Sequence, residues 1–227
     1  MKEKLSREEV FELLTAKLIE QEETRRGGRI HVWHSCMDAG KSAAVIVRAD
    51  NLRLHGFGVL CYMHKNHPRA DELVIESRTG LKLPAEITRL FDVETFEQEV
   101  QELVDKNKRA AVLFDDMHFL SAEEAEFLIY MTDKYSLLLL CYGLSVGSFG
   151  DPWPGSARLM ACAHDMQEIE VPCAFCHSKA VRHIRTDSKG AVVRSGEQLH
   201  TAKTKKAEDA AYFSVCLRHY YDLHGRP

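Results

Sequence analysis

Short apolar runs alternate with amphipathic stretches through the middle of this chain. Residues 30–33 form a short strand-like run, and three runs have the length and composition of buried strands, at residues 59–62, 110–114 and 137–142. Residues 94–104 and 122–135 repeat apolar positions at helical spacing, and Ser121 stands where a helix N-cap is expected. Alternating strands and helices predict an α/β fold, a parallel sheet covered by helices. Ligands of such a sheet bind at the carboxyl ends of its strands.

The two ends of the chain differ from this alternating middle. Ser6 and Glu9 have the spacing of a capping box, and a partly amphipathic helix is predicted from there towards Glu23. Residues 25–28, Arg-Arg-Gly-Gly, end that helix as a short linker. The pattern therefore predicts a helical extension over 1–28, a central domain over 29–165 and a smaller domain over 166–227.

A nine-residue stretch after the first predicted strand has the pattern of a phosphate-binding loop. It ends in Gly40-Lys41-Ser42 and leads into an apolar helix-like segment. Backbone N–H groups at such a helix start point at phosphates, and the helix dipole favours their negative charge. Lys41 is expected to reach the β- and γ-phosphates of ATP, and Ser42 to hold Mg²⁺. The predicted nucleotide-binding residues of this loop are Ser35, Met37, Asp38, Ala39, Gly40, Lys41 and Ser42.

The loop departs from the usual pattern at one place, because Ser35 stands where the first glycine is expected. A helix start that binds no ligand remains the alternative interpretation of this stretch.

Two acids end the predicted strand at 110–114. Asp115 is the candidate second magnesium anchor, at the end of the strand predicted to lie beside the phosphate-binding loop. Asp116 is placed to accept a proton from an attacking hydroxyl group. The alternative is that the two carboxylates only cap the turn that follows the strand.

The C-terminal part of the chain carries two chelating pairs with the spacing of a zinc site. The pairs are Cys173-x-x-Cys176 and Cys216-x-x-His219, which supply three thiolates and one imidazole. This is the closed tetrahedral ligand set of structural Zn²⁺, with no open position for water. Pro172 marks a turn beside the first pair, which argues against the alternative of free cysteines in a reduced core.

Composition places the chain among soluble globular proteins. Its 227 residues are 45% hydrophobic and 28% charged, enough for one good core and a small appendage. A formal net charge of -4 argues against general binding of nucleic acid. No apolar run has membrane-spanning length, so no membrane partner is expected. Seven cysteines, an odd number scattered in apolar runs and motifs, suit a reducing cytoplasm rather than a disulfide framework.

Five motifs in order resemble those of the type II thymidine kinases, the zinc-containing tetrameric kind, especially their bacterial and phage members. Residues 37–42, Met-Asp-Ala-Gly-Lys-Ser, are similar to the family's Met-Asn-Ala-Gly-Lys-Ser loop. The other similar segments are 77–81, 114–120, 141–144 with Gly150 and 155–156, and 212–219. Together these motifs span most of the chain.

The resemblance implies a phosphoryl transfer from ATP to the 5′-hydroxyl of deoxythymidine, for nucleotide salvage. It implies a fold of the P-loop NTPase type with a small zinc-bound lasso domain, and a cytoplasmic homotetramer. Asp116 stands for the family's catalytic Glu, and Arg69 for an arginine near the phosphates. Met37 and Phe119 are expected to wall the base pocket. Tyr212 is expected on the lasso loop that grips the nucleoside.

The departures from the family pattern cluster where the chemistry is expected. Asp116 is one methylene shorter than Glu, His118 replaces Gln, and His67 replaces an acid two residues before Arg69. The aromatic residue expected to stack on the base aligns with Ser148, and the lasso's Ile-Gly-Gly is replaced by a longer basic segment at 201–207.

These departures keep two alternatives open. The chain could phosphorylate another deoxynucleoside, or it could be a catalytically impaired relative that binds nucleotide for regulation. A DNA-binding zinc module is not favoured, because the one basic cluster, Lys203 to Lys206, is short and falls within the expected lasso.

Overall fold

The computed structural model describes residues 27–196 and 211–225, together with Ser6 and Val10. Apart from those two residues, the predicted N-terminal helix lies outside the described residues, and so does the basic segment at 201–207.

Six parallel strands form the central sheet, in the order β3-β2-β4-β5-β1-β6. The strands are β1 (Arg29–Ser35), β2 (Gly58–His64), β3 (Thr88–Phe91), β4 (Ala110–Asp115), β5 (Leu138–Leu144) and β6 (Asp165–Glu168). The prediction of a parallel α/β sheet is confirmed, and the four predicted strands are β1, β2, β4 and β5. The edge strands β3 and β6 were not predicted, because Thr-Arg-Leu-Phe and Asp-Met-Gln-Glu carry no apolar run. The predicted domain boundary after residue 165 passes through β6.

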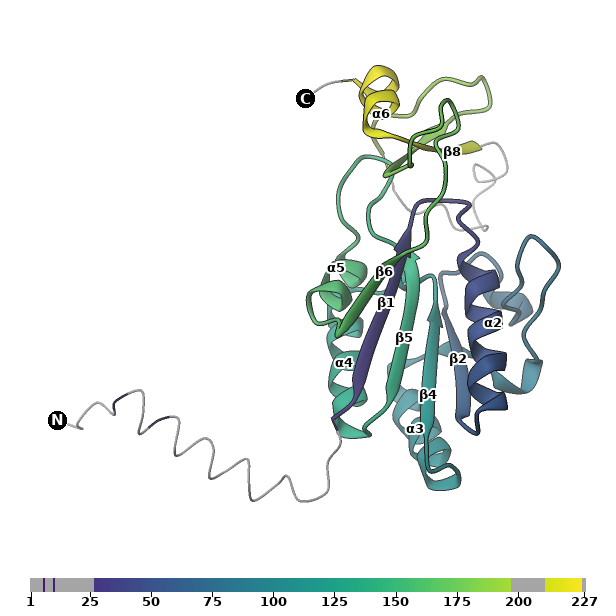
Figure 1. Cartoon of the computed structure of the whole chain (residues 1–227), viewed down its shortest axis with the longest axis vertical. Coiled ribbons are helices and arrows are strands. Elements are labelled where there is room, and N and C mark those ends of the chain that lie inside the picture. Colours follow the sequence, from purple (N-terminus) through teal and green to yellow (C-terminus); the bar gives the residue numbers. More distant parts are fainter. Residues whose placement is uncertain (1–5, 7–9, 11–26, 197–210, 226–227) are drawn as a thin grey trace.

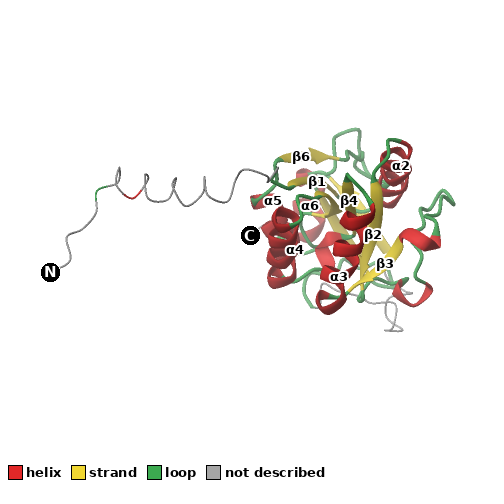
Figure 2. Cartoon of the chain, turned by 90° about the horizontal axis from the view of Figure 1, so that it is seen from below, coloured by secondary structure: helices red, strands yellow, loops and turns green. Residues whose placement is uncertain are grey.

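Helices cover both faces of the sheet and bury a separate apolar core on each (Figures 1 and 2). Helix α2 (Lys41–Leu54) packs Val45 and Ile46 against one face, where Leu113 and Tyr142 of the sheet are also buried. The opposite core is built by α3 (Val93–Lys106), α4 (Ala122–Lys134) and α5 (Pro154–Ala161). Because the central strands are buried on both faces, their sequences are continuous apolar runs rather than alternating ones.

Side-chain caps fix where the helices on that second face begin. The Ser121 hydroxyl accepts a hydrogen bond from the Glu124 amide, and the Glu124 carboxylate accepts one from the Ser121 amide. This capping box confirms the predicted N-cap of α4. Asp92 caps α3 by accepting from the Glu94 amide. None of the described helices is long and apolar enough to cross a lipid bilayer.

A small unit follows the sheet and lies above the carboxyl ends of its strands (Figure 1). It consists of the antiparallel pair β7 (Arg182–Thr186) and β8 (Ala211–Val215), followed by α6 (Leu217–His224). Several contacts tie it to the sheet domain, among them the Ser214 hydroxyl on β8, which donates to the Met37 carbonyl oxygen at 2.7 Å, and the Tyr220 hydroxyl of α6, which donates to the Ser148 carbonyl oxygen at 3.3 Å. The C-terminal unit therefore sits over the loop that follows β1.

Candidate active site and metal centre

The loop between β1 and α2 turns at two residues with positive φ, Asp38 at 63° and Gly40 at 81°. Gly40 is the N-cap of α2, and glycine reaches this left-handed conformation at no steric cost. Having no side chain, Gly40 leaves the first-turn amides of α2 uncapped. An uncapped helix N-terminus, which carries the positive end of the helix dipole, favours an anion.

A cavity of about 390 Å³ opens in front of this helix N-terminus. Three further segments meet it there: the turn after β2, a hairpin-like loop after it, and the end of β4. The residues that line the cavity are Asp38–Ala43, His67–Arg69, Glu76–Thr79, Asp115, Asp116 and Phe119. Most of the predicted nucleotide-binding residues therefore share one cavity with both acids.

Ser35, Met37 and Tyr212 are the predicted nucleotide- and nucleoside-binding residues that do not line this cavity. Ser35 is buried, and its hydroxyl donates to the Cys36 carbonyl oxygen at 3.0 Å. Met37 is half-buried beneath β8, which its carbonyl oxygen contacts. Tyr212 is half-buried on β8 itself, with its ring 6.2 Å from that of His183.

Asp115 lies at the end of β4, and β4 is not the direct neighbour of β1. The expectation that it ends the strand beside the loop is corrected by the strand order, because β5 lies between β1 and β4. The loop after β1 and Asp115 are nevertheless in contact. Helix α2 packs across the face of these strands, and the Ser42 hydroxyl at its start donates to the Asp115 carboxylate. Burial and the charge of Asp116 raise the pKa of Asp115 to about 7.

One oxygen of the Asp115 carboxylate, Oδ1, is buried and has no hydrogen-bond partner among the described residues. A buried carboxylate oxygen without a partner is costly unless a ligand satisfies it. The donor set fits Mg²⁺, which prefers hard oxygen ligands such as a carboxylate and a hydroxyl.

Asp116 follows in the left-handed conformation, with φ 54° and ψ 53°. Its Oδ2 atom lies 3.3 Å from His67 Nε2, and its Oδ1 atom lies 3.8 Å from His118 Nδ1. Burial by itself would raise the pKa of Asp116, but His118, His67 and Lys41 outweigh it and lower that pKa. Asp116 is therefore ionised at neutral pH and able to accept a proton.

Two arginines at the cavity already face acids. Arg69 Nη1 donates to the Glu76 carbonyl oxygen at 3.1 Å and lies 3.4 Å from the Glu76 carboxylate. Arg78 Nη2 lies 2.5 Å from Asp38 Oδ1, so the loop after β2 is pinned to the loop after β1. Arg69 thus lines the cavity beside the helix N-terminus, and its contact with phosphates stays a prediction.

Aromatic and imidazole rings surround Phe119 on the far side of the cavity. The ring of His64 is stacked with that of Phe119, with 6.5 Å between the ring centroids, and the ring of His67 meets it edge-on with 5.9 Å between centroids. The centroid of the His118 ring lies 4.5 Å from that of Phe119. Trp153 in turn lies 5.3 Å from His118, and its buried indole Nε1 has no partner among the described residues. Of these rings, Phe119 and His67 line the cavity, and an aromatic ring is a surface on which a nucleobase can stack.

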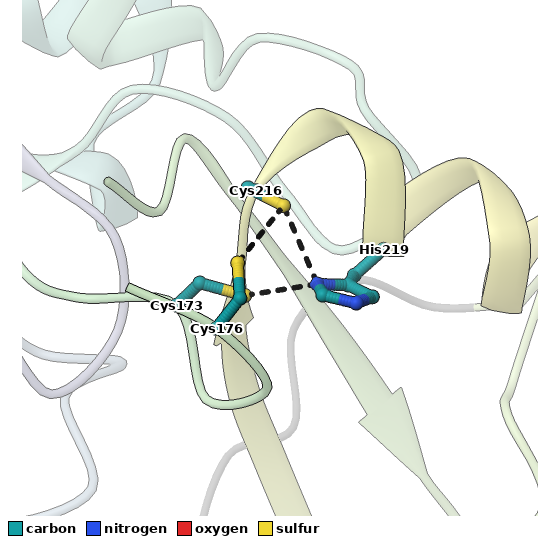
Figure 3. A group of neighbouring side chains, drawn as sticks. All are labelled: Cys173, Cys176, Cys216 and His219. Carbon is teal, nitrogen blue, oxygen red and sulfur yellow. Dashed lines mark hydrogen bonds between the residues drawn. The ribbon is translucent and has the colours of Figure 1, made fainter. Parts of the chain in front are cut away.

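The four predicted metal ligands converge in the C-terminal unit, pointing toward one another from the turn before β7 and the start of α6 (Figure 3). Their ligand atoms all lie within 4.8 Å of one another. Cys176 Sγ is 3.9 Å from Cys216 Sγ, and His219 Nδ1 is 3.3 Å from Cys173 Sγ and 3.4 Å from Cys216 Sγ. Tetrahedral zinc, with bonds of about 2.0–2.3 Å, holds such atoms about 3.5–3.8 Å apart. The group could hold a metal ion.

The surroundings of Cys173 favour ionisation of its thiol. Burial opposes its ionisation, but hydrogen bonds from the Cys216 and Phe175 amides and from His219 prevail and lower its pKa to about 6. The thiolate is the form that binds a metal ion.

Comparison with known proteins identifies the family. The family model described as thymidine kinase matches residues 28–220. A thymidine kinase of Photorhabdus laumondii is 32% identical over 198 residues, covering 86% of this chain and 92% of the relative. A thymidine kinase of Shewanella oneidensis is 31% identical, covering 86% of this chain and 97% of the relative. The chain belongs to the thymidine kinase family.

A third relative, a thymidine kinase of Vibrio cholerae, is 31% identical and covers 87% of this chain and 99% of its own length. Among solved structures, a DnaB-like replicative helicase matches 73% of this chain and 57% of its own, with a TM-score of 0.38 and 12% identity. The likeness to this helicase structure is too weak to carry an argument.

Two features of this thymidine kinase family member were not predicted from the sequence. In the sequence His67 stands out only as a replacement for an acid, and its contact with Asp116 has no signal in spacing, because the two residues follow different strands. His183 of β7 is buried, and its Nδ1 has no hydrogen-bond partner among the described residues. Burial, together with the charges of Lys41 and His118, lowers its pKa to about 3.

Proposed function

We propose that this chain transfers the γ-phosphoryl group of ATP to the 5′-hydroxyl of deoxythymidine, as a thymidine kinase of nucleotide salvage. One observation carries the proposal: the uncapped N-terminus of α2, Asp115 and Asp116 open into a single cavity. Membership of the thymidine kinase family names the reaction that this arrangement serves.

Residues 35–42 form the phosphate-binding loop in this proposal. The uncapped α2 amides and Lys41 bind the β- and γ-phosphates, with Arg69 released from Glu76 to face the same charge. Ser35 acts through the main chain, because its hydroxyl is engaged by the Cys36 carbonyl. Positioning and charge neutralisation dominate phosphoryl transfer, so these contacts are expected to supply most of the rate.

Ser42 and Asp115 would hold Mg²⁺. The hydrogen bond between them and the unpartnered Oδ1 atom of Asp115 support this assignment. When bound, the ion neutralises charge on the transferred phosphoryl group.

Asp116 is the proposed general base that takes the proton from the 5′-hydroxyl as that oxygen attacks the γ-phosphorus. Its lowered pKa keeps Asp116 ionised, and Asp116 lines the same cavity as the proposed phosphate-binding residues at the start of α2. The nucleoside base then lies against Phe119, with Met37 and Tyr212 contributed by the covering C-terminal unit. The docking of Ser214 on the Met37 carbonyl supports that cover.

The cysteine and histidine group is proposed as a structural zinc site that ties down the lasso between β7 and β8. A full set of protein ligands leaves no position for water, so the bound ion supplies stability rather than chemistry. By resemblance we also propose that the protein is cytoplasmic and forms a homotetramer. Light scattering of the purified protein would measure the number of subunits.

A phosphorylation assay with ATP and Mg²⁺ across thymidine, deoxyuridine, deoxycytidine, deoxyadenosine and deoxyguanosine tests the proposed function. We expect thymidine to be phosphorylated in preference to the other four. Preference for another base would support the alternative acceptor, and no product from any nucleoside would support a regulatory relative. ATP binding by calorimetry, run in parallel, separates a chain that binds without turnover from one that does not bind.

A further inference from the structure

A largely buried contact joins the turn after β2 to the end of β4. His67 Nε2 lies 3.3 Å from Asp116 Oδ2, and the two side chains are 11% and 20% exposed. Both residues line the cavity. The edge of the His67 ring also meets Phe119 at 5.9 Å, which limits rotation of the imidazole.

The backbone sets which nitrogen of His67 carries the proton. The Arg69 amide donates to His67 Nδ1 at 3.1 Å. A ring nitrogen that accepts a hydrogen bond is unprotonated, so the proton of the neutral imidazole is on Nε2. That N–H is the one on the side of Asp116, whose Oδ2 lies 3.3 Å from Nε2 and accepts a hydrogen bond from His67.

His118 cannot serve the other carboxylate oxygen in the same way. Its Nδ1 accepts from the Leu144 amide at 3.4 Å and lies 3.8 Å from Asp116 Oδ1, which is beyond hydrogen-bond distance. His67 is the one side chain in the described part of the chain that donates to Asp116. The two oxygens are thereby distinguished: Oδ2 is held, and Oδ1 keeps its lone pairs for a proton.

We propose that His67 is a positioning residue for Asp116, and this rests on the proposed function of Asp116 as general base. The bond from Nε2–H fixes the rotation of a short acid that stands in a strained left-handed backbone conformation. Held by Oδ2, the carboxylate presents Oδ1 to the 5′-hydroxyl. A hydrogen-bond donor thus stands at position 67, where the resemblance expects a second acid.

A matched pair of substitutions tests this role, because the amide of Gln reaches the place of Nε2 and the amide of Asn reaches that of Nδ1. His67→Gln keeps a donor for Asp116, whereas His67→Asn keeps only the group near the Arg69 amide. We expect kcat for thymidine to fall about 10–100-fold in His67→Asn, the scale of a small misplacement, and less than about 10-fold in His67→Gln. The KM for ATP should not change in either. Equal losses in the two variants would overturn the proposal.

A double substitution separates positioning from a general structural role. In an Asp116→Asn background, His67→Asn should cost no further activity, because the group that it positions is already lost. A full additional loss would show that His67 acts on something other than Asp116, which contradicts the proposal.

The tautomer can be measured without any turnover. In the full chain labelled with ¹⁵N-histidine, long-range ¹H–¹⁵N correlations report which ring nitrogen carries the proton, and His67→Gln identifies the signals of His67. We expect the Nε2–H tautomer near neutral pH. The Nδ1–H tautomer would overturn the pairing, even in an active enzyme. The expected tautomer in a wild-type chain without kinase activity would instead count against the proposed function.

Discussion

Polar side chains converge at two places in this molecule, and the two places are supported differently. At the cavity, Asp115 and Asp116 extend from a sheet whose two faces carry large apolar cores. In the C-terminal unit, the buried cluster is Cys173, Ile184, Val215, Cys216 and Tyr220, so two metal-ligand candidates are themselves part of the core. We therefore expect the sheet to keep its fold without a ligand in the cavity, and the C-terminal unit to lose stability without a metal ion on its cysteines.

This difference explains where the family pattern is altered and where it is complete. A tetrahedral site needs four ligands of the right kind, and all four are present here. A phosphoryl-transfer site works through charge and position, which neighbours from other strands can adjust. The cavity accordingly holds His67 and Asp116 as an interacting pair, in place of the two acids that the resemblance expects. Substitutions at the two places should therefore separate stability from activity.

Loss of the metal ligands should have the largest effect. Cys176→Ser removes one thiolate, and structural zinc contributes roughly 10–16 kcal/mol of apparent binding free energy in small zinc domains. We expect about one zinc per chain in the wild type, less in the variant, and a lower melting temperature with proteolysis confined to residues after 170. Elemental analysis and limited proteolysis measure both.

Cys162→Ser is the matched control, because Cys162 is exposed and lies outside the metal group. A metal-free wild type with unchanged stability would remove the contrast between the two places.

Asp116→Asn should have the next largest effect, and on activity alone. Asn keeps the size of the side chain and loses the ability to accept a proton, so kcat should fall by roughly 10²–10⁴-fold. ATP affinity and melting temperature should stay near the wild-type values, since two cores support the sheet. Asp105→Asn, on the exposed side of α3, controls for the change of charge. Wild-type turnover in Asp116→Asn would place the base elsewhere.

Lys41→Ala should weaken ATP binding without unfolding the chain. A hydrogen bond to a charged group contributes about 1.5–3 kcal/mol, which corresponds to a loss of affinity of about 10–100-fold. Isothermal titration calorimetry measures this directly, with Lys106→Ala, an exposed lysine paired with Glu102, as control. Equal affinity in wild type and Lys41→Ala would contradict the phosphate-binding loop.

The smallest effect is a pH dependence of stability, to which each place contributes one buried histidine. Burial lowers the pKa of His118 at the cavity to about 4 and that of His183 on β7 to about 3, from 6.5 in an exposed histidine. Below about pH 6.5 these two histidines therefore bind protons in the unfolded chain but stay neutral in the folded chain. Their contribution to stability is complete above pH 6.5 and falls as the pH drops towards 4, by about 1.4 kcal/mol per histidine for each unit.

Urea unfolding at pH 7.5, 6.5 and 5.5 measures this dependence. His183→Gln should flatten the fall in the free energy of unfolding between pH 6.5 and 5.5, and His118→Gln should do so to a similar degree. Parallel curves for wild type and His183→Gln would show that His183 is not held neutral by burial.

The sequence by itself determined the features whose information is local. Strands β2, β4 and β5 are nearly continuous apolar runs, because strands buried on both faces need apolar side chains at most positions. The cap at Ser121 follows from hydrogen bonds within one turn. The metal ligands could be named because one turn offers both members of a pair such as Cys173 and Cys176 to a single ion.

Only the tertiary structure decided how distant segments meet. It placed β5 between β1 and β4, and it joined Ser42 to Asp115 through the path of α2 across the sheet. It also paired His67 with Asp116, surrounded Phe119 with three histidines and left Met37 beneath β8. Such contacts depend on strand order and on rotamers set by packing, and neither has a period that can be seen along the chain.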